Sequence, residues 1–519
     1  MSVSIATGSN SGIKLRDILP QAEFLNAPNL TVRSCAGKLQ ECQQEDLFVA
    51  LVDADNDGHE DALQAIRKGA TAVVTERLLP VSVPQCIVSD SRIAYGKICQ
   101  ALAGQPSRRI KTVAVGGTDG KTTTAHLITS ILEEANKSTG LHSSIQAGSK
   151  NLANCEDGVT PPALAHMLAE MVMRDREFAV LETNSMQLAE HQFAGVQLDV
   201  AAIINLRGNH FGFHNSLKNY RRAQFRLLEY LKPSGVAVMN ADDPGVYFML
   251  DKIDHPTLTV GIKQEADIRG KIVESNLYET TFTIRAGDET AMVRTSIPGT
   301  HHVYNCLIAA ATALLQGIDL PTIARGLEKV KSLPGRMNHV RCGQPFPVLI
   351  EEAASPYRLG VALHTLRKQV PGKVFCIFNA PIDADPDTAS RFGRIAERSC
   401  DVPFITRPTT KNSQSLGEQT DYEPIHQILD GFSNPAKAHI MPDRIAAIEL
   451  ALKQAKAGDA ILIAGRGNQP IAQLADGRWQ LTDMEVCQSW LYGDSVPGES
   501  IPTEASPAAI FPIENYRRC

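Results

Sequence analysis

A glycine-rich turn between an apolar segment and a helix constrains the fold of this chain more than any other feature. Val113–Gly116 is an apolar run that predicts a buried strand, Gly117–Thr123 supplies the turn, and residues 125–134 have helical spacing. Backbone N–H groups in such a turn, together with the positive end of the helix dipole, can cradle phosphate oxygens. The sequence therefore predicts a nucleoside triphosphate site at one end of an α/β sheet.

The turn matches the phosphate-loop pattern except at Val115, which stands where the pattern has glycine. Lys121 is expected to reach the β- and γ-phosphates, and Thr122 to offer its hydroxyl to Mg²⁺. A chance Gly-Lys-Thr in a surface turn is the alternative, which the strand, the double glycine and the helix together disfavour. The residues of the turn expected to bind ATP are Gly117, Thr118, Asp119, Gly120, Lys121, Thr122 and Thr123.

Composition excludes several classes of protein. The 519 residues provide enough chain for about two to four domains, and the formal net charge of -6 gives no sign of a nucleic-acid-binding surface. The 11 cysteines include no C-x-x-C pair and no Cys/His cluster at zinc spacing, which is typical of a reducing compartment. No apolar leader occurs at residues 1–14, and no apolar run has the length of a membrane span. We therefore expect a soluble cytoplasmic protein.

The order of predicted strands and helices indicates an α/β protein of three domains. We expect a small N-terminal α/β domain at residues 1–107 and a central P-loop domain with a parallel sheet at 108–334. A C-terminal Rossmann-like domain is expected at 335–493, because strands and helices alternate there again. Residues 494–519, rich in Pro, Ser and Glu, are expected to form a disordered tail.

The series of motifs along the chain resembles the Mur ligase family of cytoplasmic ATP-dependent amide ligases. The likeness is closest to the MurE type, which adds the third residue to UDP-N-acetylmuramoyl-dipeptide. It covers about residues 15–491, and its specificity comes from the order of the motifs, since only the P-loop is specific by itself. The motifs are DLFVAL, GTDGKTTT, VTPPALAHMLAEM, VAVMNADDPG, HHVYNCLIAAATAL, PGRM, DRIAAIELAL and GDAILIAGRG.

The resemblance implies a role for each domain. The first would seat the UDP end of the substrate, the second would bind ATP, and the third would bring the amino acid and close over the site. The family reaction forms an acyl phosphate on a carboxylate of the substrate, which an amine then attacks. The implied cofactors are ATP and Mg²⁺, and the implied substrates are a UDP-linked muramoyl peptide and an amino acid. A monomer that neither binds nucleic acid nor inserts into membranes is expected.

The resemblance also implies catalytic and metal-binding residues. Lys121, Glu182 and His210 would be catalytic, and Thr122 would join Glu182 and His210 in holding the metal. Glu182 ends a predicted strand, where parallel sheets place functional groups, although a solvated strand-end acid is the alternative. His210 follows another strand end, and a purely structural histidine remains open there.

Four further residues match family positions that bind substrates. Asn305 and Arg336 correspond to positions that contact adenine or ribose, while a polar residue at a helix start and a surface arginine remain the alternatives. Thr160 and Ser185 are expected to contact the muramoyl substrate.

The departures from the family pattern fall on residues that perform chemistry. Gln224 stands where the family has a lysine that is carbamylated and helps to hold Mg²⁺. Glutamine forms no carbamate. It can offer a neutral oxygen, but a negative metal ligand is lost. Further altered motifs are Glu182–Met186, Asn209–Gly212, Glu351–Tyr357, Asn379–Asp385, Pro408–Lys411 and Gly465–Gln469.

Two functions are therefore compared. An active ATP-dependent ligase is favoured, because Lys121, Thr122, Glu182 and His210 are all present. The alternative is a catalytically impaired MurE-like paralogue that binds ATP or a cell-wall precursor in a regulatory or scaffold role. Folate-type polyglutamate ligation is weaker, because that group lacks a first domain like this one. The amino acid that is added is not defined by the sequence, since the motif that selects it is replaced.

Overall fold

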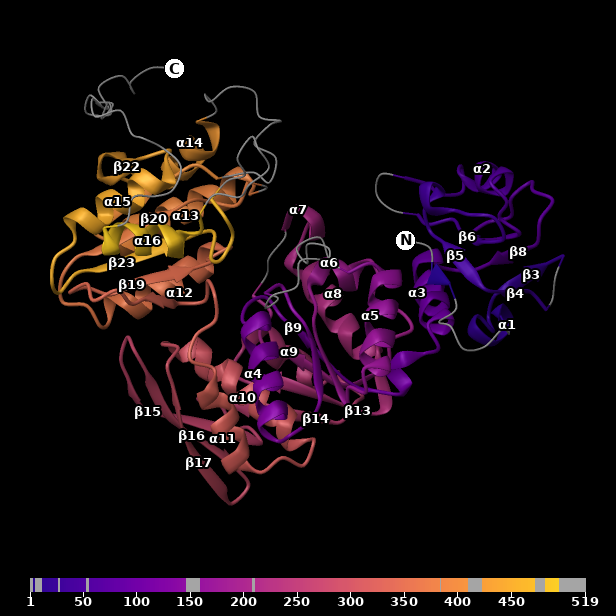
Figure 1. Ribbon diagram of the computed structural model, residues 1–519, viewed down its shortest axis with the longest axis horizontal. Coiled ribbons are helices and arrows are strands. Elements are labelled where there is room, and N and C mark those ends of the chain that lie inside the picture. The colour runs from indigo at the N-terminus through magenta and orange to yellow at the C-terminus, as the bar shows by residue number, and fades with distance from the viewer. Residues whose placement is uncertain are drawn as a thin grey trace. The chain divides into compact units, whose positions relative to one another are not determined.

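The structure is a computed structural model that describes most of the chain (Figure 1). Two compact units are present, and each is described by itself. The first contains the described residues up to Ile272 with Phe282–Val293 and Thr300–Lys329, and the second contains the rest. The predicted tail lies outside the described residues. The described residues are 3–4, 12–26, 29–52, 56–145, 159–207, 211–382, 384–408, 422–471 and 481–493.

The N-terminal part of the first unit contains a six-stranded sheet of order β1-β5-β6-β7-β8-β3 and a two-stranded sheet, β2-β4. The elements are β1 (Val3–Ser4), β2 (Ile13–Lys14), α1 (Leu15–Ile18), β3 (Glu23–Leu25), β4 (Thr31–Val32), β5 (Ser34–Ala36), β6 (Leu47–Val49), α2 (Ala62–Arg67), β7 (Ala72–Thr75), β8 (Gln85–Ile87) and α3 (Ser91–Leu102). Strands β5 to β8 pair in parallel. Leu47 and Val49 pack with α3, and Phe48 packs with α2, because successive strand residues face opposite sides.

The central sheet has nine strands in the order β10-β11-β9-β12-β13-β14-β15-β16-β17. The pairs from β10 to β15 are parallel. The strands are β9 (Lys111–Gly116), β10 (Thr139–His142), β11 (Phe178–Glu182), β12 (Leu198–Ile203), β13 (Leu231–Asn240), β14 (Thr257–Gly261), β15 (Ile268–Ser275), β16 (Thr280–Ala286) and β17 (Glu289–Thr295).

Helices cover both faces of this sheet, as the unbroken apolar runs of its strands predict. Ala114 belongs to a core that includes Leu168 of α5 and Leu227 of α8. Val113 and Val115 are also buried. Helices α4 and α10 pack against the sheet, and α11 packs against α4 and α10 (Figure 1). The helices are α4 (Lys121–Glu134), α5 (Pro161–Met173), α6 (Ser185–Ala189), α7 (Phe211–His214), α8 (Leu217–Glu229), α9 (Pro244–Leu250), α10 (Thr300–Leu314) and α11 (Leu320–Lys329).

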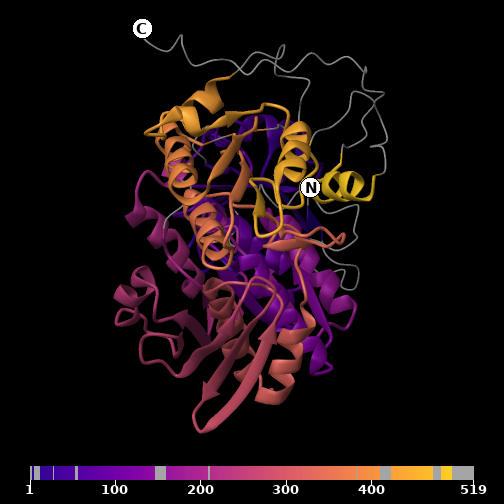
Figure 2. The same cartoon turned by 90° about the vertical axis from the view of Figure 1, so that its left-hand side faces the viewer.

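The second unit contains a six-stranded sheet of order β18-β19-β23-β20-β21-β22, in which only β18 pairs antiparallel. The elements are β18 (Asn338–Val340), β19 (Val348–Glu351), α12 (Pro356–Arg367), β20 (Val374–Phe378), α13 (Pro386–Ser399), β21 (Val402–Ile405), α14 (Glu423–Leu429), β22 (His439–Ile440), α15 (Arg444–Gln454), β23 (Ala460–Ala464) and α16 (Asp483–Tyr492). Helices α12 to α14 share one core with the sheet, and α15 and α16 share another. In Figure 2 these orange and yellow helices lie on opposite sides of the strands. The predicted α/β class with parallel sheets is confirmed.

Candidate nucleotide-binding site

The P-loop joins the end of β9 to the start of α4, as the sequence predicts. Gly117 and Gly120 both have positive φ angles, 131° and 86°, which glycine adopts without strain. A Cβ atom added to Gly120 would lie 2.3 Å from Oδ1 of Asn305, so α10 approaches the loop closely there. The structure therefore brings Asn305, predicted to contact adenine or ribose, against the loop.

Asn205, which was not predicted from the sequence as a site residue, holds the loop from the end of β12. Its Oδ1 accepts from the backbone N–H of Asp119 at 2.9 Å, and its Nδ2 donates to the carbonyl of Asp119 at 3.0 Å. Its own carbonyl accepts from Thr118 N–H at 3.0 Å. The ammonium of Lys121 donates to the Thr118 carbonyl at 2.9 Å, and Thr123 is buried in the first turn of α4.

Thr122 and Glu182 meet beside the loop, because β9 and β11 are neighbours in the sheet and Glu182 pairs with Val115. Thr122 Oγ1 donates to Glu182 Oε1 at 2.8 Å. Ser144, which was not predicted from the sequence, donates its backbone N–H to the other carboxylate oxygen at 2.9 Å. Its hydroxyl also lies 2.9 Å from Thr122 Oγ1.

The side-chain oxygens of Thr122 and Glu182 are suitable ligands for a magnesium ion. Mg²⁺ binds through one or two protein carboxylates or hydroxyls and completes its shell with phosphates and water. Thr122 and Glu182 supply one hydroxyl and one carboxylate at the start of α4 and the end of β11, next to the phosphate loop. Within the described residues, no group of three or more His, Cys, Asp or Glu side chains is arranged to hold a metal by itself.

The other residues predicted for this site have different positions. His210 lies outside the described residues. Ser185 is buried at the start of α6, and its Oγ lies 2.9 Å from Nε2 of His214, which was not predicted from the sequence. Thr160 is exposed at the N-terminus of α5. Gln224 is buried under the loop, where Gly117 N–H donates to its Oε1 at 3.1 Å.

Arg336 belongs to the second unit, where it forms part of a cluster of four charged side chains. Its guanidinium pairs with Glu352, which also pairs with Arg358. Arg358 in turn bonds Glu351 at 2.8 Å. Burial alone would raise the pKa of Glu352, but the charges of Arg336 and Arg358 outweigh it and lower that pKa to about 2.

A buried ion pair that the sequence did not reveal lies in the second unit. The guanidinium of Arg444 bonds both carboxylate oxygens of Asp483 at 2.8 Å. Its remaining N–H groups donate to Asn379 Oδ1 at 3.1 Å, Thr406 Oγ1 at 3.2 Å and the Ala464 carbonyl at 2.9 Å. All five donors of the arginine are thereby used, which links the ends of several strands of this sheet.

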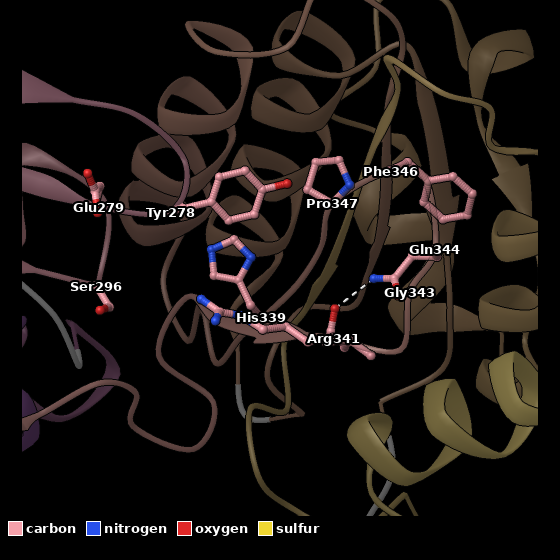
Figure 3. Close-up of a pocket in the computed structure, with 10 residues that line it drawn as sticks. Tyr278, Glu279, Ser296, His339, Arg341, Gly343, Gln344, Phe346 and Pro347 are labelled. Carbon is pink, nitrogen blue, oxygen red and sulfur yellow. Dashed lines mark hydrogen bonds between the residues drawn. The ribbon is translucent and has the colours of Figure 1, made fainter.

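The second unit also contains a cavity of about 510 Å³, and neither the cluster around Arg336 nor the pair of Arg444 and Asp483 is among the residues that line it. Figure 3 shows Tyr278 next to His339 on its wall, with the two rings stacked at a centroid distance of 5.2 Å. His339 Nε2 lies 2.8 Å from the carbonyl of Leu277. None of the residues predicted for the nucleotide or substrate site is among those lining the cavity, so it is not the predicted site.

A strand, a phosphate loop and a helix at the end of a parallel sheet place the chain among the phosphate-loop proteins. Two family models identify it further. The Mur ligase middle domain matches residues 115–313, and the Mur ligase glutamate ligase domain matches residues 335–467. The chain belongs to the Mur ligase family, which confirms the resemblance that the motifs indicated.

Similar proteins cover nearly the whole chain. The UDP-N-acetylmuramoyl-L-alanyl-D-glutamate--2,6-diaminopimelate ligase of Syntrophomonas wolfei is 31% identical over 456 residues, which are 86% of this chain and 92% of that protein. A solved structure of a ligase of the same name has a TM-score of 0.67 and 23% identity, and the match covers 93% of this chain and 99% of the other. The MurF ligase of Thermotoga maritima in complex with ADP has a TM-score of 0.56 and 20% identity, over 89% and 97% of the two chains.

No described helix has the length and apolar character needed to span a bilayer.

Proposed function

We propose that this chain is an ATP-dependent ligase that joins an amino acid to a UDP-muramoyl-peptide-like substrate in the synthesis of peptidoglycan precursors. The observation that carries the proposal is the contact between Thr122 and Glu182 at the base of the phosphate loop, with Lys121 beside it. The relatives that cover most of the chain, including the Syntrophomonas wolfei ligase, bear the names of enzymes of this kind. The reaction is proposed to occur in the cytoplasm, by a monomer.

The proposed reaction has two steps. A carboxylate oxygen of the substrate attacks the γ-phosphorus of ATP, the bond between the γ-phosphorus and the β,γ-bridging oxygen breaks, and ADP leaves. The amine of the incoming amino acid then attacks the acyl carbon, loses a proton, and displaces inorganic phosphate. Both steps bring negatively charged groups together, so cations must offset that charge.

The residues of this chain have separate tasks in the proposal. Lys121 leaves the Thr118 carbonyl and contacts the phosphates, while the backbone N–H groups of the loop orient them. Thr122 and Glu182 would hold Mg²⁺, which supplies positive charge against the phosphate oxygens when it is bound. His210 is proposed to join them as a metal ligand.

Substrate contacts are assigned by the same likeness. Asn305 and Arg336 are proposed to bind adenine or ribose, and Thr160 and Ser185 to contact the muramoyl peptide. We also propose three functional domains: residues 1–107 for the UDP end, 108–334 for ATP and 335–493 for the amino acid. The separate six-stranded sheet near the N-terminus supports the first of these.

Because position 224 is a glutamine, the proposed ligase works without a carbamylated lysine there. The charge that a carbamate would bring is absent, so fewer anionic groups of the protein face the metal and the phosphates. The proposed enzyme therefore depends on Glu182 as its main anionic metal ligand.

The proposal is tested by incubating the full chain with ATP, Mg²⁺, UDP-N-acetylmuramoyl-dipeptide and a panel of amino acids. We expect phosphate release that requires both the peptide substrate and one amino acid, and a product heavier by that amino acid less water. Lys121→Ala should abolish the release, and Lys137→Ala, at a side chain that is 42% exposed, should not. ATP binding without product for every amino acid of the panel would contradict the proposal and favour the regulatory or scaffold role.

A further inference from the structure

The side chain of Gln224 forms a closed pair of hydrogen bonds with one residue of the phosphate loop. Helix α8, which carries Gln224, packs against β9 (Figure 1). Oε1 of Gln224 accepts from Gly117 N–H at 3.1 Å, and Nε2 donates to the Gly117 carbonyl at 3.3 Å. Gln224 as a whole residue is 1% exposed. Both polar groups of the Gly117 backbone are thus satisfied by one buried amide.

Tyr220 extends this contact to the next residue of the loop. It lies one helical turn before Gln224 on α8, and its hydroxyl accepts from Gln224 Nε2 at 3.2 Å. The same hydroxyl lies 2.7 Å from Thr118 Oγ1, which also accepts from the backbone N–H of Arg207 at 3.0 Å. Two neighbouring side chains of α8 therefore hold two consecutive loop residues, Gly117 and Thr118.

The chemistry of the contact selects an amide at position 224. An amide both accepts and donates, whereas a carboxylate only accepts and an ammonium only donates. The reverse orientation of the amide would place its NH₂ group against Gly117 N–H and its oxygen against the Gly117 carbonyl. A Cβ atom on Gly116 would lie 3.1 Å from Oε1, so the glycine there allows the amide to approach the strand end.

We infer that Gln224 is a positioning residue that fixes the start of the phosphate loop through Gly117, and that its oxygen is not a metal ligand. The inference rests on the proposed function in one respect, that this loop binds a nucleotide. It gives position 224 in this chain a role different from the ligand role that the family resemblance implies. Loss of the two hydrogen bonds would leave the backbone of Gly117 unheld by position 224. Nucleotide binding would then weaken whether or not a metal is bound.

Gln85 offers a matched control elsewhere in the first unit. Its Oε1 accepts from Leu79 N–H and its Nε2 donates to the Leu79 carbonyl, both at 2.9 Å. It is 4% exposed, so it is buried almost as deeply as Gln224. Gln85→Met thus removes the same kind of amide–backbone pair from the N-terminal sheet and leaves the loop intact.

The first measurement is the Kd for ATP by calorimetry, with Mg²⁺ and with EDTA, for Gln224→Met, Gln224→Glu and Gln85→Met. Gln224→Met loses both buried hydrogen bonds to Gly117, whereas Gln224→Glu keeps an acceptor for the Gly117 N–H but sets a carboxylate oxygen against the Gly117 carbonyl. Either change should weaken ATP binding by about tenfold, by a similar factor with and without Mg²⁺. Gln85→Met should bind ATP as the natural chain does. A weakening confined to the Mg²⁺ condition, or tighter Mg²⁺-dependent binding by Gln224→Glu, would show a metal ligand and overturn the inference.

The second measurement needs no nucleotide. Hydrogen exchange of a peptide spanning Gly117 should be faster in Gln224→Met than in the natural chain and unchanged in Gln85→Met, and Tyr220→Phe should give a smaller increase at the same peptide. Unchanged exchange in Gln224→Met overturns the inference even if ATP binds. Failure of the natural chain to bind ATP, with exchange behaving as expected, overturns the proposed function and leaves the positioning of Gly117 established.

Discussion

The hydroxyl of Thr122 donates to the carboxylate of Glu182 at 2.8 Å, although 60 residues separate them in the chain. The parallel pairing of β11 with β9 places Glu182 opposite Val115, just before the phosphate loop begins. Ser144 N–H bonds the second carboxylate oxygen at 2.9 Å, which fixes the orientation of the carboxylate. Catalysis is proposed to depend on this hydroxyl and this oriented carboxylate, which lie beside the phosphate loop.

Glu182→Gln should remove most of the effect of Mg²⁺ on ATP binding, because the amide keeps the shape and loses the charge. We expect ligase turnover to fall by about 100-fold, the scale of losing one electrostatic group at a reacting phosphate. Glu177→Gln is the control, since Glu177 is exposed just before β11 and pairs with Lys137. Calorimetry with and without Mg²⁺ measures the first effect, and equal Mg²⁺ dependence in Glu182→Gln and the natural chain would refute it.

Gly120→Ala should weaken ATP binding by more than about tenfold. The new Cβ would lie 2.3 Å from Asn305 Oδ1, and a φ of 86° costs a non-glycine residue about 1–3 kcal/mol. Gly317→Ala separates these two effects, because Gly317 has a φ of 77° but no heavy atom within 4 Å of an added Cβ. The control should lose stability alone and keep its Kd for ATP. Equal binding by both variants would show that the contact with Asn305 has no influence on the loop.

Asp483→Asn should destabilise the second unit by about 3–5 kcal/mol, because it leaves the buried guanidinium of Arg444 without its counter-charge. Both side chains are almost completely buried, at 1% and 0% exposure. Arg391→Ala, which breaks the exposed pair with Asp387, should cost at most about 1 kcal/mol. Urea unfolding followed by circular dichroism measures both. A loss for Asp483→Asn no larger than that of the control would contradict this role of the pair.

The cluster around Glu352 should make the stability of the second unit depend on pH under acid conditions. The pKa of Glu352 is lowered from 4.5 to about 2 in the folded chain, where Arg336 and Arg358 outweigh the effect of burial. Because the folded pKa lies below the unfolded one, this contribution is complete above about pH 4.5 and is lost as the pH falls toward 2.

Glu352→Gln removes the titrating group and tests this dependence. The difference in urea midpoint between the natural chain and the variant should be largest at neutral pH and should shrink between about pH 4.5 and pH 2. A difference that stays constant over that range would show that Glu352 does not titrate as described.

The sequence predicts the parts of the site that local pattern determines. The strand, the loop glycines and the helix from Lys121 follow from neighbouring residues. Glu182 was predicted because it ends a strand and matches a metal-binding glutamate of the family that the chain resembles. Asn205, Ser144 and His214 were missed, since each acts through a contact with a residue distant in the chain. No local pattern distinguishes them from other polar residues at strand ends and loops.

The role of Gln224 shows the same limit more clearly. The sequence shows that the residue is not a lysine, and from this the resemblance predicts a lost ligand. It does not show that both polar groups of the amide meet the backbone of Gly117, because that depends on how α8 packs on β9. The pairing of Arg444 with Asp483 was hidden for the same reason.

The most direct test of the ligase proposal follows an oxygen atom. The carboxylate of UDP-N-acetylmuramoyl-dipeptide that accepts the amino acid is labelled with ¹⁸O, and the phosphate released with ATP, Mg²⁺ and the amino-acid panel is analysed by mass spectrometry. An acyl phosphate requires that one labelled oxygen passes from the carboxylate to the phosphate. We expect phosphate that carries one ¹⁸O atom. Unlabelled phosphate, or no phosphate released with any amino acid, would contradict the proposed ligase reaction.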